Sequence, residues 1–440
     1  MPEPTARQVS LDLINYIDAS PTATHATLET IRRLVDRGYK CLDEKNKWTI
    51  SPGDKFYVTR NGSSVIAVNV GTAPFDEAGF RIIGAHTDFP GLRLKPNGIY
   101  AKQGYIQLGV EIYGGPILHT WLDRDLGIAG TLVVENENGI RETVPYAIKK
   151  PVCRIPNLAP HIKVDKNAEF KINTQDHMPP VIGLGGDEIL EEKPVLKLIA
   201  DAAGVDPDRV LSYTLEVFDL QPGAIGGMNE EFVFSRAIDN LAACHAAVEA
   251  FLNSSEPAPF TRIIALFDNE EVGSQTMQGA GSRFLDMIIE RLNASSENPR
   301  ESYFRSIANS LFISNDGAHA VNPNYPEAHE PRHHPVLNGG PVLKINANQR
   351  YTTNSDALDH LKYCAKRADV KLQEFVARTD VGTGSTIGPM TATRLGIRSV
   401  DIGVPMISMH SSREMGGVED QLSMIKLLTE HFQYRKRERQ

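Results

Sequence analysis

The stretch Phe267-Asp268-Asn269-Glu270-Glu271-Val272-Gly273-Ser274 places two adjacent glutamates directly after the apolar run Thr261-Arg262-Ile263-Ile264-Ala265-Leu266. This run, rich in β-branched residues, predicts a strand buried on both faces, so the glutamates are expected where that strand ends. Neighbouring carboxylates repel each other and raise each other's pKa. A fold usually avoids such a pair unless a bound cation or a role in proton transfer compensates for the repulsion. One metal-binding glutamate beside one that moves protons would satisfy both demands. A solvated surface turn is the alternative interpretation of such a pair.

Further polar residues recur at predicted strand ends. They are His86 and Asp88 after residues 80–85, Asp316 after residues 311–315, His410 after residues 399–404, and Asp239 in the first turn of a helix predicted over residues 235–252. Ligands of open parallel sheets bind beyond the carboxyl ends of the strands. Histidines and carboxylates without cysteine form a nitrogen and oxygen set that suits zinc, manganese or cobalt. Any one of these residues alone more often has a structural role, but their recurrence at strand ends favours a metal site.

The order of the predicted elements indicates the fold class. Apolar periodicity predicts two helices over residues 6–39, broken at 20–22, and a hairpin of strands 55–60 and 63–70 across Asn61-Gly62. From residue 235 helices and strands alternate, with helices at 235–252, 282–292, 355–368, 385–395 and 418–432 and strands at 261–268, 311–315, 372–377 and 398–403. This alternation predicts an α/β fold with a mainly parallel sheet flanked by helices.

Residues 95–228 differ in character from the rest of the chain. Alternating patterns predict strands at 105–113, 128–134 and 140–148, and a single helix is predicted at 189–203. We therefore predict an inserted, mostly β second domain at 95–228, between the segments 1–94 and 229–440 of a catalytic domain.

Composition narrows the class of protein. The 440 residues include 41% apolar and 23% charged residues, with 46 basic and 55 acidic residues and a net charge of −9. No basic field is available for nucleic acid or an anionic membrane, and no apolar run is long enough to span a bilayer. The four cysteines are dispersed, which fits a reducing compartment. We expect a cytoplasmic protein.

Two other short motifs match known catalytic motifs in part of their sequence but lack the structural context that those motifs need. His329-Glu330-Pro331-Arg332-His333 has the letters of a helical zinc motif, but its proline prevents both histidines from sharing a helical face. Gly382-Thr383-Gly384-Ser385 lacks the glycine spacing of a nucleophile elbow. Covalent serine catalysis therefore has no candidate here.

Five segments resemble, in order, the aspartyl aminopeptidase family of two-zinc exopeptidases. They are Gly84-Ala85-His86-Thr87-Asp88, Ser235-Arg236-Ala237-Ile238-Asp239-Asn240, Asp268 to Ser274, Ser314-Asn315-Asp316-Gly317-Ala318-His319-Ala320, and Ile407-Ser408-Met409-His410-Ser411-Ser412-Arg413-Glu414. The resemblance runs over nearly the whole chain with compatible spacing.

The resemblance implies two zinc ions per subunit, for which manganese or cobalt could substitute. One zinc would be held by His86, Asp239 and Asp316, and the other by Asp239, Glu271 and His410, with Asp239 bridging. Such a bridge can hold two metals about 3.5–4 Å apart. Glu270 would be the general base that takes a proton from the attacking water and hands it to the leaving amine. Asp88 would fix the ring of His86 through its second nitrogen.

The resemblance also implies the substrate contacts and the assembly. His161 would reach the active site of a neighbouring subunit, and His319, Lys344 and Tyr351 would line the substrate pocket. A lysine there suits an acidic side chain. The family is commonly a homo-oligomer built from dimers, a tetrahedral dodecamer in many members.

We therefore expect a metallo-aminopeptidase that removes N-terminal Asp or Glu from peptides. One alternative is a neutral or broad, leucine-type aminopeptidase, because Asn322 stands where some relatives have a histidine. An alternative of another class is a catalytically silent, metal-bound oligomer that binds peptides or serves as a scaffold.

Overall fold

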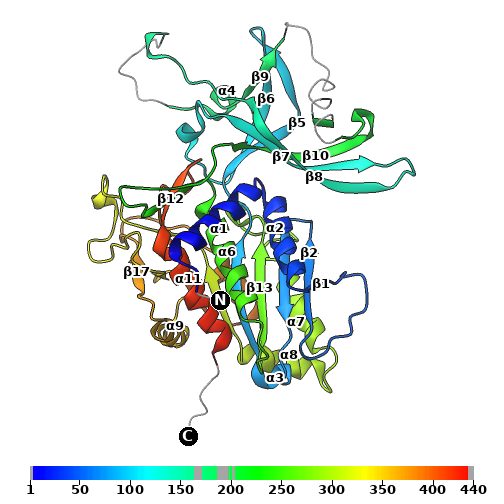
Figure 1. Ribbon diagram of the computed structural model, residues 1–440, viewed down its shortest axis with the longest axis vertical. Coiled ribbons are helices and arrows are strands. Elements are labelled where there is room, and N and C mark those ends of the chain that lie inside the picture. Colours follow the sequence, from blue (N-terminus) through cyan, green and yellow to red (C-terminus); the bar gives the residue numbers. More distant parts are fainter. Residues whose placement is uncertain (1–2, 163–170, 186–196, 198, 201–203, 435–440) are drawn as a thin grey trace. The chain divides into compact units, whose positions relative to one another are not determined.

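The computed structural model describes residues 3–162, 171–185, 197, 199–200 and 204–434, and the chain forms two compact units (Figure 1). The larger unit comprises Met1–Asp88, Gly223–Met409 and Glu414–Gln440. The smaller unit comprises Phe89–Pro222 and His410–Arg413. The insertion predicted at residues 95–228 begins and ends six residues later than the long segment of this smaller unit.

A nine-stranded sheet forms the centre of the larger unit. Its strands lie in the order β1 (Lys40–Cys41), β2 (Lys55–Arg60), β3 (Ser64–Asn69), β13 (Thr261–Phe267), β4 (Phe80–His86), β14 (Leu311–Asn315), β18 (Ser399–Gly403), β16 (Val342–Ile345) and β17 (Gln373–Val376). The four central strands, β13, β4, β14 and β18, run parallel to one another. The predicted mainly parallel α/β fold is therefore confirmed.

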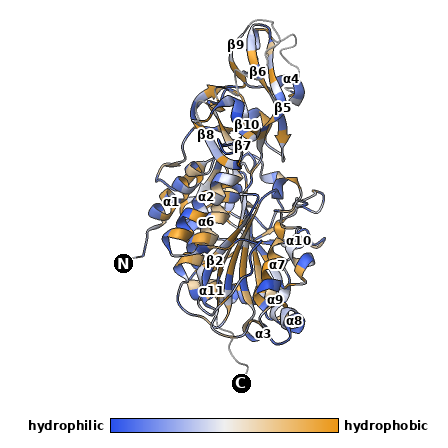
Figure 2. Cartoon of the chain, turned by 90° about the vertical axis from the view of Figure 1, so that its right-hand side faces the viewer, coloured by the Kyte–Doolittle hydropathy of each residue, from blue (hydrophilic) through white to orange (hydrophobic). Residues whose placement is uncertain are grey.

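The register of the central strands brings their carboxyl ends together. Phe80 at the start of β4 pairs with Thr261 of β13, and His86 at its end pairs with Phe267. Every residue of β4, β13, β14 and β18 is buried, as strands covered on both faces require. In Figure 2 the strands of this unit are predominantly orange, the colour of apolar residues. The polar residues that follow β4, β13 and β14 consequently meet at one edge of the sheet.

Helices cover both faces of this sheet. They are α1 (Ala6–Ala19), α2 (Ala23–Asp36), α3 (Phe75–Ala78), α6 (Ile238–Asn253), α7 (Phe284–Asn293), α8 (Pro299–Ala308), α9 (Ser355–Ala368), α10 (Ile387–Leu395) and α11 (Val418–Gln433). Figure 2 shows α6 and α11 on one side of the sheet and α7 and α10 on the other. Among the described residues, no helix combines the length and hydropathy that crossing a bilayer requires.

The start of α6 differs from the prediction. A helix was expected from Ser235, but Ser235 ends β12 (Phe232–Ser235) and pairs with Glu414 of β20 (Glu414–Gly417). Ala237 then adopts a left-handed conformation with φ 49°, and α6 begins only at Ile238. Strand pairing with a distant segment therefore overrode the local helical pattern. These strands belong to a small sheet in the order β11 (Ala224–Gly226), β12, β20, β19 (Pro405–Ile407) and β15 (Ala318–His319).

The smaller unit contains a six-stranded antiparallel sheet, as the mostly β prediction requires. Its order is β8 (Arg141–Cys153), β7 (Leu126–Glu135), β10 (Val210–Asp219), β5 (Gly91–Lys102), β6 (Tyr105–Tyr113) and β9 (Val181–Leu184). Leu92, Ile128, Leu132 and Leu215 are fully buried in its core. Short helical turns η1 (Leu118–Trp121), η2 (Pro160–Ile162), η3 (Pro207–Arg209) and α4 (Thr174–His177) complete it. The helix predicted over residues 189–203 lies largely outside the described residues.

Candidate active site

His86 ends β4 with its side chain only 1% exposed. Its Nδ1 lies 3.0 Å from the backbone carbonyl oxygen of Asp88 and 3.4 Å from the carboxylate of the same residue. Because a carbonyl oxygen only accepts hydrogen bonds, the proton of a neutral ring belongs on Nδ1. The other nitrogen, Nε2, lies 3.5 Å from carboxylate oxygens of both Asp239 and Asp316. This is the orientation in which histidine serves as a metal ligand.

Asp239 and Asp316 complete a buried group around Nε2 of His86. Asp239 lies at the start of α6 with φ −80° and ψ 108°, which are not helical angles. Its backbone N–H donates to the carboxylate of Glu414 at 3.0 Å. Asp316 follows β14, as predicted. One potential ligand atom from each of His86, Asp239 and Asp316 lies within 4.8 Å of the other two.

Glu270 and Glu271 follow β13 in the short turn η4 (Glu270–Val272). Their backbone N–H groups donate to the two carboxylate oxygens of Asp88, each at 3.1 Å. His86, Glu270 and Glu271 form a second group whose potential ligand atoms lie within 4.8 Å of one another. Asp88 therefore connects the end of β4 to the turn after β13.

The electrostatics of this cluster indicate a place for a cation. Burial raises the pKa of Glu270 to about 7, and the neighbouring carboxylates add to this effect while His86 opposes it. Burial and then the charge of Asp239 raise the pKa of Glu271. Burial disfavours the charged form of His86, but hydrogen bonding to Asp239 and Asp316 outweighs it and raises the pKa of the imidazole. A divalent cation among these side chains would stabilise all the carboxylates in their charged form.

The donor set fits zinc. One imidazole nitrogen and several carboxylate oxygens converge from separate elements, and the histidine is oriented through its other nitrogen, as zinc sites require. The same nitrogen and oxygen chemistry also accommodates manganese or cobalt.

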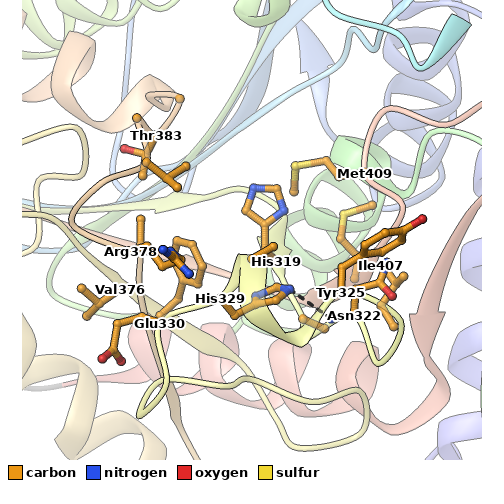
Figure 3. A pocket seen from close by; sticks show the side chains of 18 of the residues that line it. His319, Asn322, Tyr325, His329, Glu330, Val376, Arg378, Thr383, Ile407 and Met409 are labelled. Carbon is orange, nitrogen blue, oxygen red and sulfur yellow. Dashed lines mark hydrogen bonds between the residues drawn. The ribbon is translucent and has the colours of Figure 1, made fainter. Parts of the chain in front are cut away.

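A cavity of about 460 Å³ lies in the larger unit. His319 and Tyr351, both predicted to bind substrate, line it. In Figure 3 Val376, Arg378 and Thr383 lie on one side of His319, and Met409, Ile407 and Tyr325 lie on the other. The remaining walls are largely apolar and include Phe375, Val381 and Met406. The cavity has the size and lining of a small-molecule or side-chain pocket.

Lys344, on β16, is predicted to line the substrate pocket but is 4% exposed and is not among the described residues that line the cavity. Its Nζ donates to the backbone carbonyl oxygens of Gly317, at 2.7 Å, and Asp316, at 3.2 Å. The ammonium group lies 5.2 Å from the centre of the Tyr351 ring. Lys344 therefore contacts the turn that carries Asp316.

His161 and His410 both belong to the smaller unit. His161 is exposed in η2, next to the exposed apolar side chain of Ile162. Nδ1 of His410 lies 3.0 Å from the carbonyl oxygen of Gly115. His410 directly follows Met409, which lines the cavity, so one peptide bond separates this histidine from the cavity lining.

Several contacts of the site were not predicted. The thiol of Cys244 on α6 donates to the backbone carbonyl oxygen of His86 at 2.9 Å, and Glu414 accepts from the backbone of Asp239. Neither residue stands at the end of a predicted strand, and although Glu414 ends one of the segments that resemble the family, no role was predicted for it. Arg378 closely follows β17 and lines the cavity, and the same search of strand ends could have found it.

Comparisons with known proteins identify the family of this chain. The family model for aminopeptidase I zinc metalloprotease (M18) matches residues 16–432. The chain is 43% identical over 423 residues to the probable M18 family aminopeptidase 2 of Pseudomonas aeruginosa, covering 96% of this chain and 97% of the relative.

Solved structures show the same fold. A chain of the cryo-EM structure of the Ape4 and Nbr1 complex is 40% identical and superposes with a TM-score of 0.93, covering 97% of this chain and 86% of that one. The mApe1 dodecamer of S. cerevisiae is 30% identical with a TM-score of 0.86, and 97% of each chain is covered. The family match spans nearly the whole sequence, so the chain belongs to the aminopeptidase I zinc metalloprotease (M18) family and is a zinc-dependent aminopeptidase.

Proposed function

We propose that this aminopeptidase removes the N-terminal residue of peptides with two zinc ions. His86, Asp239 and Asp316 would hold one ion, and Asp239, Glu271 and His410 the other, so that Asp239 bridges them. The observation that carries the proposal is the convergence of His86, Asp239 and Asp316, whose potential ligand atoms lie within 4.8 Å of one another in a buried place. When bound, the zinc ions supply Lewis acidity that polarises the scissile carbonyl and acidifies water.

In this proposal Glu270 is the general base. It accepts a proton from the attacking water and returns it to the leaving amine. Its backbone N–H is held by Asp88, which keeps the carboxylate close to the metal ligands while leaving it to move protons. Glu271, held in the same way, is the ligand of the pair. The alternative of a silent scaffold would need the ligand but would have no use for the base.

We further propose a preference for N-terminal Asp or Glu, with His319, Lys344 and Tyr351 contacting the substrate. Two permanent positive charges support this preference. Lys344 lies beside the Tyr351 ring, and Arg378 lies in the cavity wall. The apolar lining formed by Phe375, Val381 and Met406 favours the second candidate, an aminopeptidase for neutral side chains.

The active form in this proposal is a homo-oligomer built from dimers, with a tetrahedral dodecamer as the expected assembly. The dodecamer of S. cerevisiae mApe1 supports it, as does the exposure of His161 beside the 67% exposed Ile162 in the smaller unit. His161 would then act across a subunit contact. The dispersed cysteines lead us to place the activity in the cytoplasm.

One experiment tests the main proposal. The zinc-loaded protein is assayed on matched peptides that begin with Asp, Glu, Leu or Lys, before and after treatment with a chelator. We expect chelation to abolish hydrolysis, zinc to restore it, and two zinc ions to be bound per subunit. Activity that survives with less than one metal per subunit contradicts the two-metal proposal. A preference for Leu over Asp and Glu would select the neutral alternative.

A further inference from the structure

The carboxylate of Asp401, on β18, is buried and accepts three hydrogen bonds. Its Oδ2 accepts the backbone N–H of Thr352 at 2.6 Å and the hydroxyl of the same residue at 2.7 Å. Its Oδ1 accepts the hydroxyl of Thr386 at 2.6 Å. Asp401 is 0% exposed, so water does not compete for these bonds, and hydrogen bonds to a charged acceptor are about twice as strong as neutral ones. One carboxylate therefore joins two segments that are distant in the chain.

The first of these segments forms one wall of the cavity. Thr352 directly follows Tyr351, which lines the cavity. The next residue, Thr353, adds a second attachment. Its hydroxyl accepts the backbone N–H of Asp401 at 3.1 Å and donates to the carbonyl oxygen of Lys344 at 2.7 Å. The backbone beside Tyr351 is therefore fixed to β18 and β16 at the position of Asp401.

The second segment forms another wall of the cavity. Residues 381–384 all line the cavity, and Thr386, two residues further along the chain, is the N-cap of α10. The hydroxyl of Thr386 accepts the backbone N–H of Gly388 at 3.2 Å while it donates to Asp401. A Cβ atom on Gly388 would lie 2.5 Å from Oδ2 of Asp401, so the lack of a side chain allows the first turn of α10 to reach the carboxylate. The end of this wall is therefore also fixed at Asp401.

The two walls also contact each other nearer the surface. The hydroxyl of Ser385 donates to the carbonyl oxygen of Arg350 at 3.2 Å in an exposed place, where water competes with it. Figure 3 shows Thr383, from the second wall, on one side of His319. The buried bonds to Asp401 are therefore the stronger constraint on the distance between the walls.

We propose that Asp401 is a positioning residue that fixes both walls of the cavity at a common point and thereby sets the fit of the first side chain of the substrate. The inference rests on the proposed function, because it takes the cavity as the pocket for that side chain. Asp401 acts through Thr352 and Thr386 and does not itself touch the substrate. Because a displacement of about 1 Å can reduce a rate about 100-fold, a small movement of either wall is sufficient to change selectivity.

The test removes the hydroxyl donors and leaves the carboxylate in place, since substitution of Asp401 would also remove a negative charge that acts on Lys344. Thr352→Val and Thr386→Val each replace a hydroxyl with a methyl group, and Thr386→Ser retains the hydroxyl. Thr391→Val is the matched control. Thr391 also lies on α10 and is 2% exposed, but its hydroxyl has no hydrogen-bond partner within the described chain.

Four quantities are measured for each variant. They are kcat and KM on matched peptides that begin with Glu, Leu or Ala, zinc affinity by competition with a chromogenic chelator, and the melting temperature. The preferred peptide is whichever of Glu and Leu the wild-type enzyme cleaves better. The ratio of kcat/KM for this peptide to that for the Ala peptide reports how well the pocket fits a long side chain.

We expect Thr386→Val to lower this ratio by about tenfold, mainly through KM, because a long side chain reaches the displaced wall and the methyl group of alanine does not. Thr352→Val should lower it in the same direction. Thr386→Ser should restore the ratio to within about threefold of wild type, and Thr391→Val should match wild type. Zinc affinity should stay unchanged in all four. Because both donors meet one carboxylate, the double valine variant should differ from the product of the single losses by about threefold or more.

Several results would overturn the inference. They are an unchanged ratio in the folded valine variants, an equal loss on the Ala peptide, an equal loss in Thr391→Val, weakened zinc binding, or losses that simply multiply in the double variant. If Thr386→Val does not fold, Thr352→Val, which keeps the backbone bond to Asp401, carries the same expectation. The zinc content of the wild-type enzyme and its choice between Glu and Leu decide the proposed function separately, because neither enters the ratio to Ala.

Discussion

Asp88→Asn is the substitution that most directly tests how the site is held together. The carboxylate of Asp88 is 3% exposed and accepts the N–H groups of Glu270 and Glu271 at 3.1 Å each. Asparagine has nearly the same shape but replaces one acceptor oxygen with an NH₂ donor. One of the two backbone N–H groups must then face another donor. The contact of the Asp88 backbone carbonyl with His86 does not involve the side chain and is retained.

The size of the effect follows from these contacts. One charge-assisted hydrogen bond is lost and one buried N–H loses its acceptor, which together should lower the free energy of unfolding by about 1–3 kcal/mol. The turn that carries both glutamates is then less well fixed. Because a displacement of about 1 Å at a catalytic group can reduce a rate about 100-fold, we expect kcat to fall by about 10- to 100-fold. Zinc affinity should fall by a similar factor through Glu271.

Urea unfolding of the zinc-free protein, zinc competition and steady-state kinetics measure these three quantities. Asp286→Asn is the matched control. Asp286 is also buried and accepts hydrogen bonds from Tyr303 and Arg283, but it lies on α7 and contacts none of the proposed zinc ligands. The control should lose stability and keep its zinc affinity. If Asp88→Asn unfolds at the wild-type urea concentration and turns over within twofold of wild type, the reasoning about Asp88 is wrong.

Three further outcomes are expected. Glu270→Gln should retain zinc and lose about 10²- to 10⁴-fold in kcat, the usual worth of general acid-base catalysis; near-normal turnover would exclude Glu270 as the base. His161→Ala should lower activity without weakening zinc binding, and dissociated, fully metallated monomers should be inactive; active monomers would exclude action across a subunit contact. Burial, Arg81 and Arg398 lower the pKa of His360 to about 3. The unfolded chain protonates this histidine below about pH 6.5 and the folded chain does not, so stability should fall on acidification by roughly 1.4 kcal/mol per pH unit down to about pH 3. In urea titrations between pH 6.5 and 4, His360→Gln should reduce the dependence of the free energy of unfolding on pH. An unchanged dependence would show that His360 is not the group responsible.

The parallel sheet explains why much of the site could be predicted. His86, Glu270 and Asp316 each follow a strand whose apolar, β-branched residues are recognisable in the sequence, and parallel strands in register end at one edge of the sheet. Asp239 was placed correctly beside them although the start of its helix was not. Its position depends on β12 pairing with β20, a contact between residues nearly 180 positions apart in the chain. No local pattern carries that information.

The backbone contacts of Lys344 are a feature that the sequence alone could not predict. Its position on a strand near the site suggested a charge for the substrate, and that much is compatible with its place on β16. Which acceptors an ammonium group meets depends on the register of β16 against β18 and on the close approach that Gly403 permits at Asp316. Two consecutive carbonyl oxygens turned toward one lysine cannot be read from the identities of Asp316 and Gly317.

Hydrogen bonds between side chains and backbone maintain the geometry of this site. The backbone of each predicted site residue of the larger unit's metal-binding cluster forms a hydrogen bond with a side chain from elsewhere in the chain. The pairs are His86 with Cys244, Glu270 and Glu271 with Asp88, Asp239 with Glu414, and Asp316 with Lys344. Carboxylates that repel one another need such anchors, because without bound zinc their charges favour a more open arrangement. The anchors therefore hold the cluster together before zinc binds. Substitution of an anchor should weaken zinc affinity, whereas substitution of the base Glu270 should not.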